Sequence, residues 1–224
     1  MAAAAAAPTA PTALARGPLP SSSPLTYPAP VSPFAKSAAQ YLVDNDKHFD
    51  GLAVGALVFS PTERILLVQR AAHDSMPNRW ETPGGAADPE DATLLDAAAR
   101  ELWEESGLVA RRVTRVVSEG EGRAPGQVFT NRTGSKILCR FSFEVEVEGW
   151  EGVSLDPAEH QDYVWATEEE VRAGRAEGRE IVFTNRGMMA LVLEGFRLRK
   201  EENGGKEEEP AGEEGERGRE VLQG

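Results

Sequence analysis

The chain has 224 residues, with 37 acidic and 24 basic side chains, a formal net charge of −13 and one cysteine. This length suits one medium-sized domain with tails better than two full domains. The negative charge disfavours nucleic acid and anionic membrane surfaces as partners, because both require a surplus of Lys and Arg. No stretch approaches the roughly 18 apolar residues of a membrane-spanning helix. A lone Cys139 excludes an internal disulfide and a cysteine-based metal site, so a reducing compartment, by default the cytoplasm, is expected.

Both ends of the chain have biased compositions. The first 36 residues are almost entirely Ala, Pro, Ser and Thr, which offer little bulk for a core, so we expect residues 1–40 to be a disordered leader. A mitochondrial presequence is the alternative, since no acid precedes Asp44. Residues 201–224 hold nine Glu against three basic residues and are predicted to be a disordered tail. The folded domain is therefore predicted to span residues 41–200.

Between the tails, the hydrophobic period changes from strand-like to helical. A continuous apolar run at 52–59, a Ser-Pro-Thr break and a second run at 65–68 predict a buried hairpin. Residues 141–148 alternate apolar and acidic side chains, which predicts a half-buried strand with its acids facing outward. Thr167 followed by Glu170 has the pattern of a capping box, and apolar spacing from 188 to 198 predicts a further helix.

The segment from Asp88 to Leu108 predicts a helix with an unusual concentration of acids. Asp88 and Pro89 are typical of a helix start and Gly107 of a helix end, so the helix is expected at about 89–106. At about 100° per residue, three glutamates share roughly a 100° arc. They are Glu101, Glu104 and Glu105.

These like charges repel one another, and a hard divalent cation such as Mg²⁺ would offset the repulsion because it takes oxygen ligands. Arg100 lies beside Glu104 and could orient the acids, and Asp96 could in turn hold Arg100. The alternative is that the three acids form the solvated face of an amphipathic helix in a Glu-rich protein.

Residues 85–108 resemble the Nudix box of the Nudix hydrolases, which is written G-x5-E-x7-R-E-U-x-E-E-x-G-U with U apolar. The second half, from Arg100 to Leu108, matches at every defined position. The first half has one extra residue, and its first Glu is best represented by Asp91, so a role for Asp91 in holding Arg100 stays open. The resemblance extends over about 51–200. It implies an α/β (α+β) fold in which a mixed β-sheet lies between helices and the box forms a loop–helix–loop.

The resemblance also implies a chemistry. Nudix hydrolases cleave a nucleoside diphosphate linked to another moiety, such as ADP-ribose, a nucleotide sugar or a nucleoside triphosphate, and they use Mg²⁺ or Mn²⁺. Carried over to this chain, Glu101, Glu104 and Glu105 become metal ligands and catalytic residues, and the backbone carbonyl of Gly84 joins the metal ligands. Many relatives are dimers, so a homodimer is included in the expectation. The nucleotide itself stays open.

Other residues complete the predicted site. The general base is either a box glutamate or an acid outside the box, for which Glu159 is the candidate, with an ordinary surface glutamate as its alternative. The adjacent His160 is either structural or catalytic. Arg70 and Arg100 are the predicted substrate-binding cations, because an arginine can bind a phosphate through two hydrogen bonds. For Arg70 a surface cation is the alternative.

Two further points each have an alternative interpretation. The first is the activity, for which the alternative is a Nudix-fold nucleotide-binding or sensing module without catalytic activity; the lengthened box favours it and the complete set of box glutamates argues against it. The second concerns the locally basic stretch between Arg111 and Arg140, which either attracts an anionic ligand or, as we favour, balances neighbouring acids.

Overall fold

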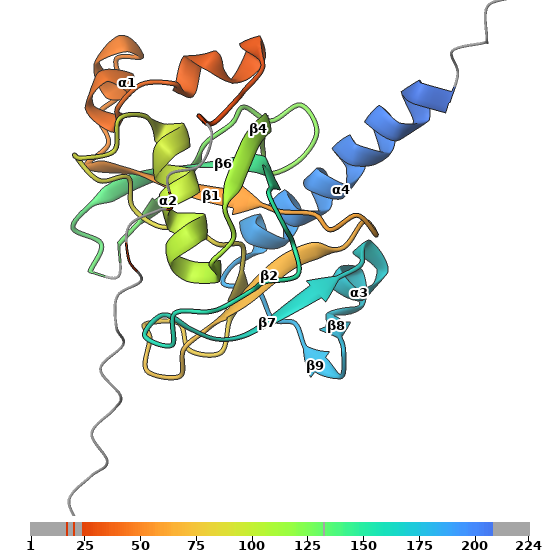
Figure 1. The fold of residues 1–224 in the computed structure, drawn as a ribbon. Helices are drawn as coiled ribbons and strands as arrows, with labels where there is room; N and C mark the ends of the chain where they lie inside the picture. The colour runs from red at the N-terminus through yellow and green to blue at the C-terminus, as the bar shows by residue number, and fades with distance from the viewer. Residues whose placement is uncertain (1–16, 18–19, 21–23, 132, 208–224) are drawn as a thin grey trace, which may run out of the picture.

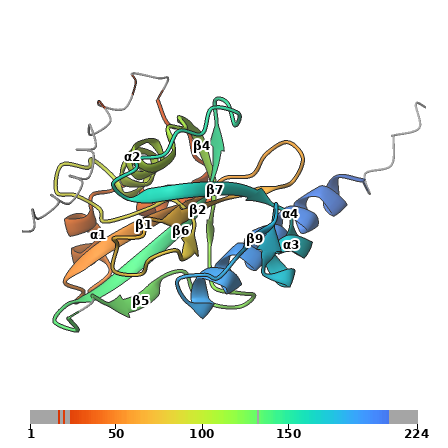
Figure 2. The ribbon, with the colours of Figure 1, turned by 90° about the horizontal axis from the view of Figure 1, so that it is seen from below.

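The computed structural model describes residues 17, 20, 24–131 and 133–207. Its strands lie between helices on two sides, with α2 and α4 on opposite sides of them (Figures 1 and 2). The predicted α+β class is therefore confirmed, although the strands form two main sheets and a small hairpin where one mixed sheet was expected. No helix among the described residues is long and apolar enough to cross a membrane.

The first sheet is built around one long strand. Strand β6 (Ile137–Val147) pairs in parallel with β1 (Gly51–Leu57) on one side. On its other side it pairs antiparallel with β4 (Ala110–Val117) and, nearer its start, with β5 (Gln127–Thr130). This arrangement makes β1 an edge strand, against which the loop before α2 can lie.

The second sheet has the order β3-β2-β7. Strand β2 (Ile65–Arg70) lies antiparallel between β3 (Trp80–Glu81) and β7 (His160–Ala166). The prediction of a hairpin between 52–59 and 65–68 is wrong, because β1 and β2 belong to different sheets and meet only at the bridge between Phe59 and Ile65. The physical reason is that each apolar run is long enough to pair with a strand far along the chain, β6 for β1 and β7 for β2.

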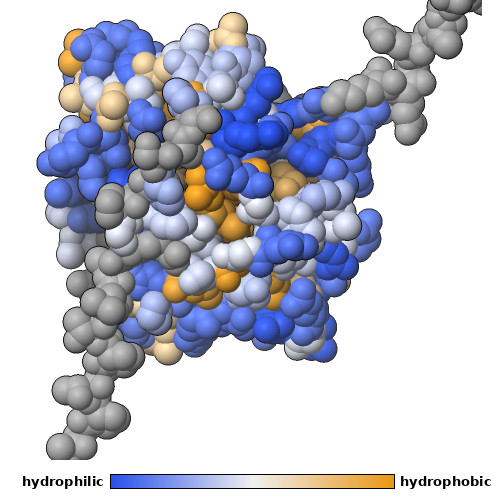
Figure 3. Space-filling model, viewed as in Figure 1, coloured by the Kyte–Doolittle hydropathy of each residue, from blue (hydrophilic) through white to orange (hydrophobic). Residues whose placement is uncertain are grey.

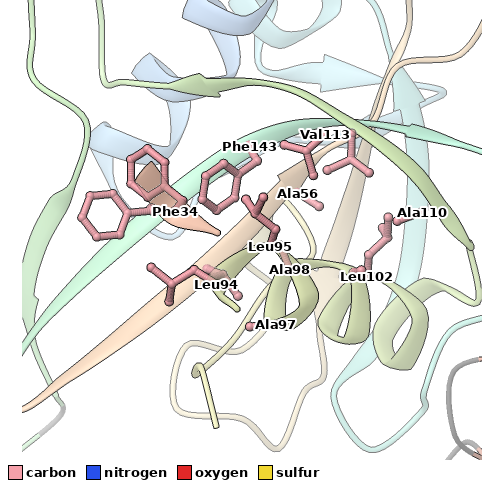
Figure 4. Close-up of a cluster of buried hydrophobic side chains, with 14 of the residues drawn as sticks. Phe34, Ala56, Leu94, Leu95, Ala97, Ala98, Leu102, Ala110, Val113 and Phe143 are labelled. Atoms are coloured by element: carbon pink, nitrogen blue, oxygen red, sulfur yellow. The ribbon is translucent and has the colours of Figure 1, made fainter. Parts of the chain in front are cut away.

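Helices cover both faces of the strands and define two cores. Helix α2 (Leu94–Ser106) packs on β1, and its buried side chains share one cluster with Ala56 of β1 and Phe143 of β6 (Figure 4). Helices α3 (Glu168–Ala173) and α4 (Arg186–Glu207), with the small hairpin β8 (Arg175–Ala176) and β9 (Arg179–Glu180), enclose the second core. The capping box at Thr167 and the helix predicted at 188–198 are both confirmed.

The folded part begins earlier than predicted. A 3₁₀ helix, η1 (Ala29–Phe34), and helix α1 (Ala38–Asp44) include residues assigned to the leader. Phe34 and Val31 are buried, and Phe34 contacts the rings of Phe141 and Phe143, so these two side chains anchor η1 on the first core. Helix α4 likewise continues past residue 201 to Glu207. Leader and tail positions 1–16, 18–19, 21–23 and 208–224 lie outside the described residues.

Two local expectations need correction. Helix α2 begins after Thr93, whose side chain accepts a hydrogen bond from the Asp96 amide, and not at Pro89; Gly107 ends the helix in a left-handed conformation, as predicted. In β6 the predicted outward-facing Glu144 is buried, because it forms ion pairs with Arg115 and Arg199.

Acids pair with two arginines of the basic stretch. Arg115 pairs with Glu144 and Arg111 pairs with Glu146, which supports the balancing role that we favoured for this stretch. The face seen in Figure 1 is mostly hydrophilic, with smaller hydrophobic areas near its centre (Figure 3).

Candidate active site

The loop before α2 is fixed along the edge of β1. The amide of Ala56 donates to Pro83 O at 2.9 Å, and the amide of Val54 donates to Gly85 O at 2.8 Å. Between them Gly84 has φ +149°, and a Cβ there would lie 2.2 Å from Val54 O. Only glycine fits this position. No hydrogen bond among the described residues uses the Gly84 carbonyl, so it stays available as the predicted ligand.

The two glycines also receive the carboxylates of α2. Gly84 N donates to Glu105 Oε2 at 2.7 Å. A Cβ on Gly85 would lie 2.6 Å from Glu101 Oε2. The absence of a side chain at Gly85 therefore lets the Glu101 carboxylate lie against the loop, and the Gly84 amide fixes the Glu105 carboxylate.

Arg100 joins the first half of the box to the second. Its guanidinium donates to Asp91 at 2.9 and 3.0 Å, to Glu101 at 2.9 Å and to Glu104 at 2.8 Å. Asp91 thus holds Arg100 despite the extra residue. Asp96, which was also predicted to hold Arg100, accepts instead from the hydroxyl of Thr93.

The box glutamates meet the second sheet at a cleft of about 300 Å³. Its lining combines the loop, α2, the end of β2 and the start of β7: Arg70, Asp74, Gly84, Gly85, Ala86, Glu101, Glu105, Glu159 and His160. The structure therefore brings together Gly84, Glu101, Glu105, Glu159 and Arg70 from the predicted site, whereas Arg100, predicted to bind substrate, does not line this cleft. Glu104 does not line this cleft, and its side chain is 45% exposed beside Arg100.

Burial raises the pKa of the two inner carboxylates, Glu101 and Glu105. Burial raises the pKa of Glu101 from 4.5 to about 7, although the neighbouring Arg100 opposes the shift. Burial also raises the pKa of Glu105 well above its usual range, against the hydrogen bond from Gly84. The negative charge of Glu159 raises the pKa of both carboxylates further. The cleft is thus an acidic site with too little positive charge for its carboxylates.

Arg70 faces this cleft but already has partners. It lies 2.6 Å from Asp74 and 2.5 Å from Glu81. These two acids hold the pKa of Arg70 above its ordinary value, even though burial acts in the opposite direction. An anion entering the cleft would therefore compete with Asp74 and Glu81 for this guanidinium.

Two buried charges lie below the loop; the sequence placed Arg140 only in the general basic stretch and gave Glu81 no role in the site. Arg140 of β6 donates through Nη2 to Thr82 O at 3.1 Å and to Pro83 O at 3.4 Å, and it passes beside Gly55, where a Cβ would lie 2.4 Å from Nη2. Burial lowers the pKa of Arg140, and the charges of Glu81, Glu105 and Glu101 oppose this shift.

Glu81 is the second of these charges. Burial alone would raise its pKa, but nearby His160 and the charges of Arg140 and Arg70 lower it below the usual value. Gly55 is the one sequence signal for this arrangement, because a glycine inside an apolar strand indicates close approach by another group.

The residues fit a divalent cation. Two buried carboxylates with raised proton affinity, a glycine loop without side chains and an open backbone carbonyl supply the oxygen donors that such ions prefer. The Glu105, Glu159 and His160 side chains also bring ligand atoms within 4.8 Å of one another.

Comparison with known proteins identifies the segment that carries this site. A family profile described as NUDIX domain matches residues 50–185. The m7GpppN-mRNA hydrolase NUDT17 of Bos taurus is 45% identical over 58 residues, which are 25% of this chain and 19% of that protein. The RNA pyrophosphohydrolase of Psychrobacter sp. is 43% identical over 60 residues, which are 27% of this chain and 32% of that protein. The match thus spans under a third of each of these relatives.

Longer and weaker similarities were also found. The RNA pyrophosphohydrolase of Cereibacter sphaeroides is 29% identical over 159 residues, covering 61% of this chain and 96% of that protein. Among solved structures, a MutT protein from Methanosarcina mazei Go1 has a TM-score of 0.49 and 22% identity, covering 67% of this chain and 94% of that one. The NUDIX domain of Shewanella oneidensis NrtR, complexed with ADP ribose, has a TM-score of 0.49 and 19% identity, with coverage of 72% and 97%.

Proposed function

This chain belongs to the NUDIX domain family, and on that premise we propose that it is a hydrolase that uses a divalent cation to cleave the diphosphate linkage of a nucleoside diphosphate derivative. Mg²⁺ or Mn²⁺ is the proposed ion. The observation that carries the proposal is the convergence of Glu101 and Glu105 with Glu159 and Arg70 on one cleft. These residues come from three separate parts of the chain.

A divalent cation bound there would neutralise phosphate charge, polarise a phosphoryl oxygen and favour ionisation of water. The protein's own groups would hold that ion in place. Arg100 orients the Glu101 and Glu104 carboxylates, and the Gly84 amide orients Glu105. Because oriented groups lose little freedom during the reaction, hydrolysis becomes a matter of positioning and electrostatics.

Glu159 and Arg70 are the proposed groups on the substrate side. Glu159 is exposed and lines the cleft, so as a general base it could pass a proton to solvent. Arg70 would bind a substrate phosphate by exchanging one of its carboxylate partners, Asp74 or Glu81, for a phosphate oxygen.

The proposal includes two classes of substrate. The net charge of −13 favours a small nucleotide over a long nucleic acid. Relatives named as RNA pyrophosphohydrolase and mRNA hydrolase nevertheless make the 5′ end of an RNA a second substrate to test. The diphosphate linkage is common to both classes, so the same acidic cleft would serve either.

The proposal is tested by product analysis. The full chain is incubated with and without Mg²⁺ and ADP-ribose, nucleoside triphosphates, dinucleoside polyphosphates or a 5′-triphosphorylated RNA. We expect Mg²⁺-dependent cleavage of at least one of them, and a loss of about 100-fold or more in kcat for Glu105→Gln. Glu169→Gln, which changes an exposed glutamate of α3 outside the cleft, is the matched control and should retain full activity.

The nucleotide-binding or sensing module is the competing function. The extra residue in the box was its main support, yet Asp91 still reaches Arg100 in this structure. Saturable nucleotide binding without turnover of any compound in the panel would refute the hydrolase and favour the binding module.

A further inference from the structure

His160 is buried beside the cleft without a hydrogen-bond partner. It is the first residue of β7, and it pairs with Arg70 at an irregularity in the β2–β7 register. The residue is only 3% exposed, and neither ring nitrogen has a hydrogen-bond partner among the described residues. A buried polar group without a partner lowers stability, so this position requires an explanation.

The nearest acid does not supply that explanation. His160 Nε2 lies 3.5 Å from Glu81 Oε1. The same oxygen accepts a hydrogen bond from Arg70 Nη1 at 2.5 Å. Glu81 is therefore already bound by a stronger donor, and its contact with His160 is too long to satisfy the imidazole.

His160 instead lies close to two carboxylates of the cleft. One ligand atom from each of Glu105, Glu159 and His160 lies within 4.8 Å of the other two. Glu105 is buried, with one oxygen held by the Gly84 amide, and Glu159 is exposed. A single ion between the three side chains could contact all of them after small rotations, and it would also satisfy the imidazole.

The nitrogen donor has a chemical consequence. Mg²⁺ takes oxygen ligands almost exclusively, whereas imidazole suits transition metals, which bind nitrogen more strongly along the series from Mn²⁺ upward. We propose that Glu105, Glu159 and His160 form a cation site with a direct nitrogen ligand, which binds Mn²⁺ in preference to Mg²⁺. This inference deepens the proposed function, on which it rests for the use of the cleft.

The test reads the ligand itself. The full chain is loaded with Mn²⁺ and studied by electron spin echo envelope modulation, which detects nitrogen coordinated to Mn²⁺. We expect nitrogen modulation in the wild-type protein, with the isotope shift after ¹⁵N labelling of histidine. We also expect Mn²⁺ to bind at least about tenfold more tightly than Mg²⁺ in competition titrations.

Variants assign the nitrogen to one side chain. The chain has three histidines, and His48 and His73 do not line the cleft. The double variant His48→Gln, His73→Gln should keep the modulation. His160→Gln should lose it and bind Mn²⁺ at least about tenfold more weakly. The double variant makes the assignment even if His160→Gln does not fold, because His160 is then the one histidine left.

Glu159→Gln serves as an intermediate case. It should weaken Mn²⁺ binding while keeping the nitrogen modulation, since it removes one oxygen charge and leaves the imidazole. Bound Mn²⁺ without nitrogen modulation, or a signal lost in the double variant, would overturn the inference.

The two proposals fail separately. Mg²⁺-dependent hydrolysis without a nitrogen ligand would leave the proposed function intact and refute this site. A nitrogen ligand on Mn²⁺ without turnover of any nucleotide, under either ion, would keep the site and refute the proposed function.

Discussion

Replacing Glu101 by Gln should stabilise the protein in the absence of divalent cations, and increasingly so as pH rises. Burial raises the pKa of Glu101 from 4.5 to about 7. Between these values the folded chain holds a proton that the unfolded chain has released, so stability falls as pH increases. Each tenfold difference in proton affinity is worth about 1.4 kcal/mol. Relative to a carboxyl group whose pKa does not change on folding, Glu101 thus lowers stability by about 1 kcal/mol at pH 5, where it is protonated in the folded chain, and by about 3 kcal/mol at pH 8, where it is mostly ionised.

Urea unfolding in the presence of a chelator measures this difference. Wild type and Glu101→Gln are compared at pH 5 and pH 8, and the gain from the substitution should grow by about 2 kcal/mol between the two. The comparison cancels the contributions of titrating groups that do not interact with Glu101. Added Mg²⁺ should then stabilise the wild type and have a smaller effect on Glu101→Gln, because the ion binds the folded state through this carboxylate.

Glu169→Gln is the control for loss of one negative charge, since Glu169 is exposed on α3. Its effect should stay within about 0.5 kcal/mol at both pH values. A gain in stability for Glu101→Gln that does not change between pH 5 and pH 8, or a destabilisation at pH 8, would refute the reasoning that burial raises the pKa of Glu101 to about 7.

Four further substitutions test how the site and the N-terminal segment are built. Gly84→Ala should destabilise the protein by about 2 kcal/mol or more, because the added Cβ meets rigid backbone. Gly85→Ala should fold and lose Mg²⁺ affinity, since the nearest atoms to its Cβ belong to the Glu101 carboxylate. Equal losses of stability for the two variants in calorimetry would contradict this difference. Arg100→Met should cost about 3 kcal/mol in urea unfolding and lower kcat, because the acids around it lose their common cation; unchanged stability would argue against its positioning role. Phe34→Ala should lower the free energy of unfolding by about 3 kcal/mol, because this ring is buried. A loss below about 1 kcal/mol in thermal unfolding would indicate that this segment is not part of the folded domain.

The residues of the site that lie on one helix could be predicted because their geometry is local. The spacing of Glu101, Glu104 and Glu105 fixes their positions around α2, and Gly107 ends that helix where expected. The start of the helix was misplaced because both Asp88 and Thr93 are good caps. The Thr93 side chain bonds the Asp96 amide, which decides between them.

The long-range parts of the site could not be read from local patterns. The parallel pairing of β1 with β6 joins Gly51 to Leu138, and no turn signal marks such a connection. The same pairing brings Arg140 under the loop before α2, so its role became visible only with the sheet. The burial of Phe34 was missed for a related reason, since Tyr27 and Phe34 are too few in an Ala- and Pro-rich segment to give a periodic pattern.

The central claim is that a divalent cation binds between Glu101 and Glu105 in the cleft formed with β2 and β7. Anomalous diffraction from crystals soaked with Mn²⁺ and a non-hydrolysable nucleotide tests it most directly. The account predicts an anomalous peak within coordination distance of both carboxylates, with a phosphate of the nucleotide beside it. Nucleotide bound in the cleft without any such peak, or Mn²⁺ bound only elsewhere, would contradict it.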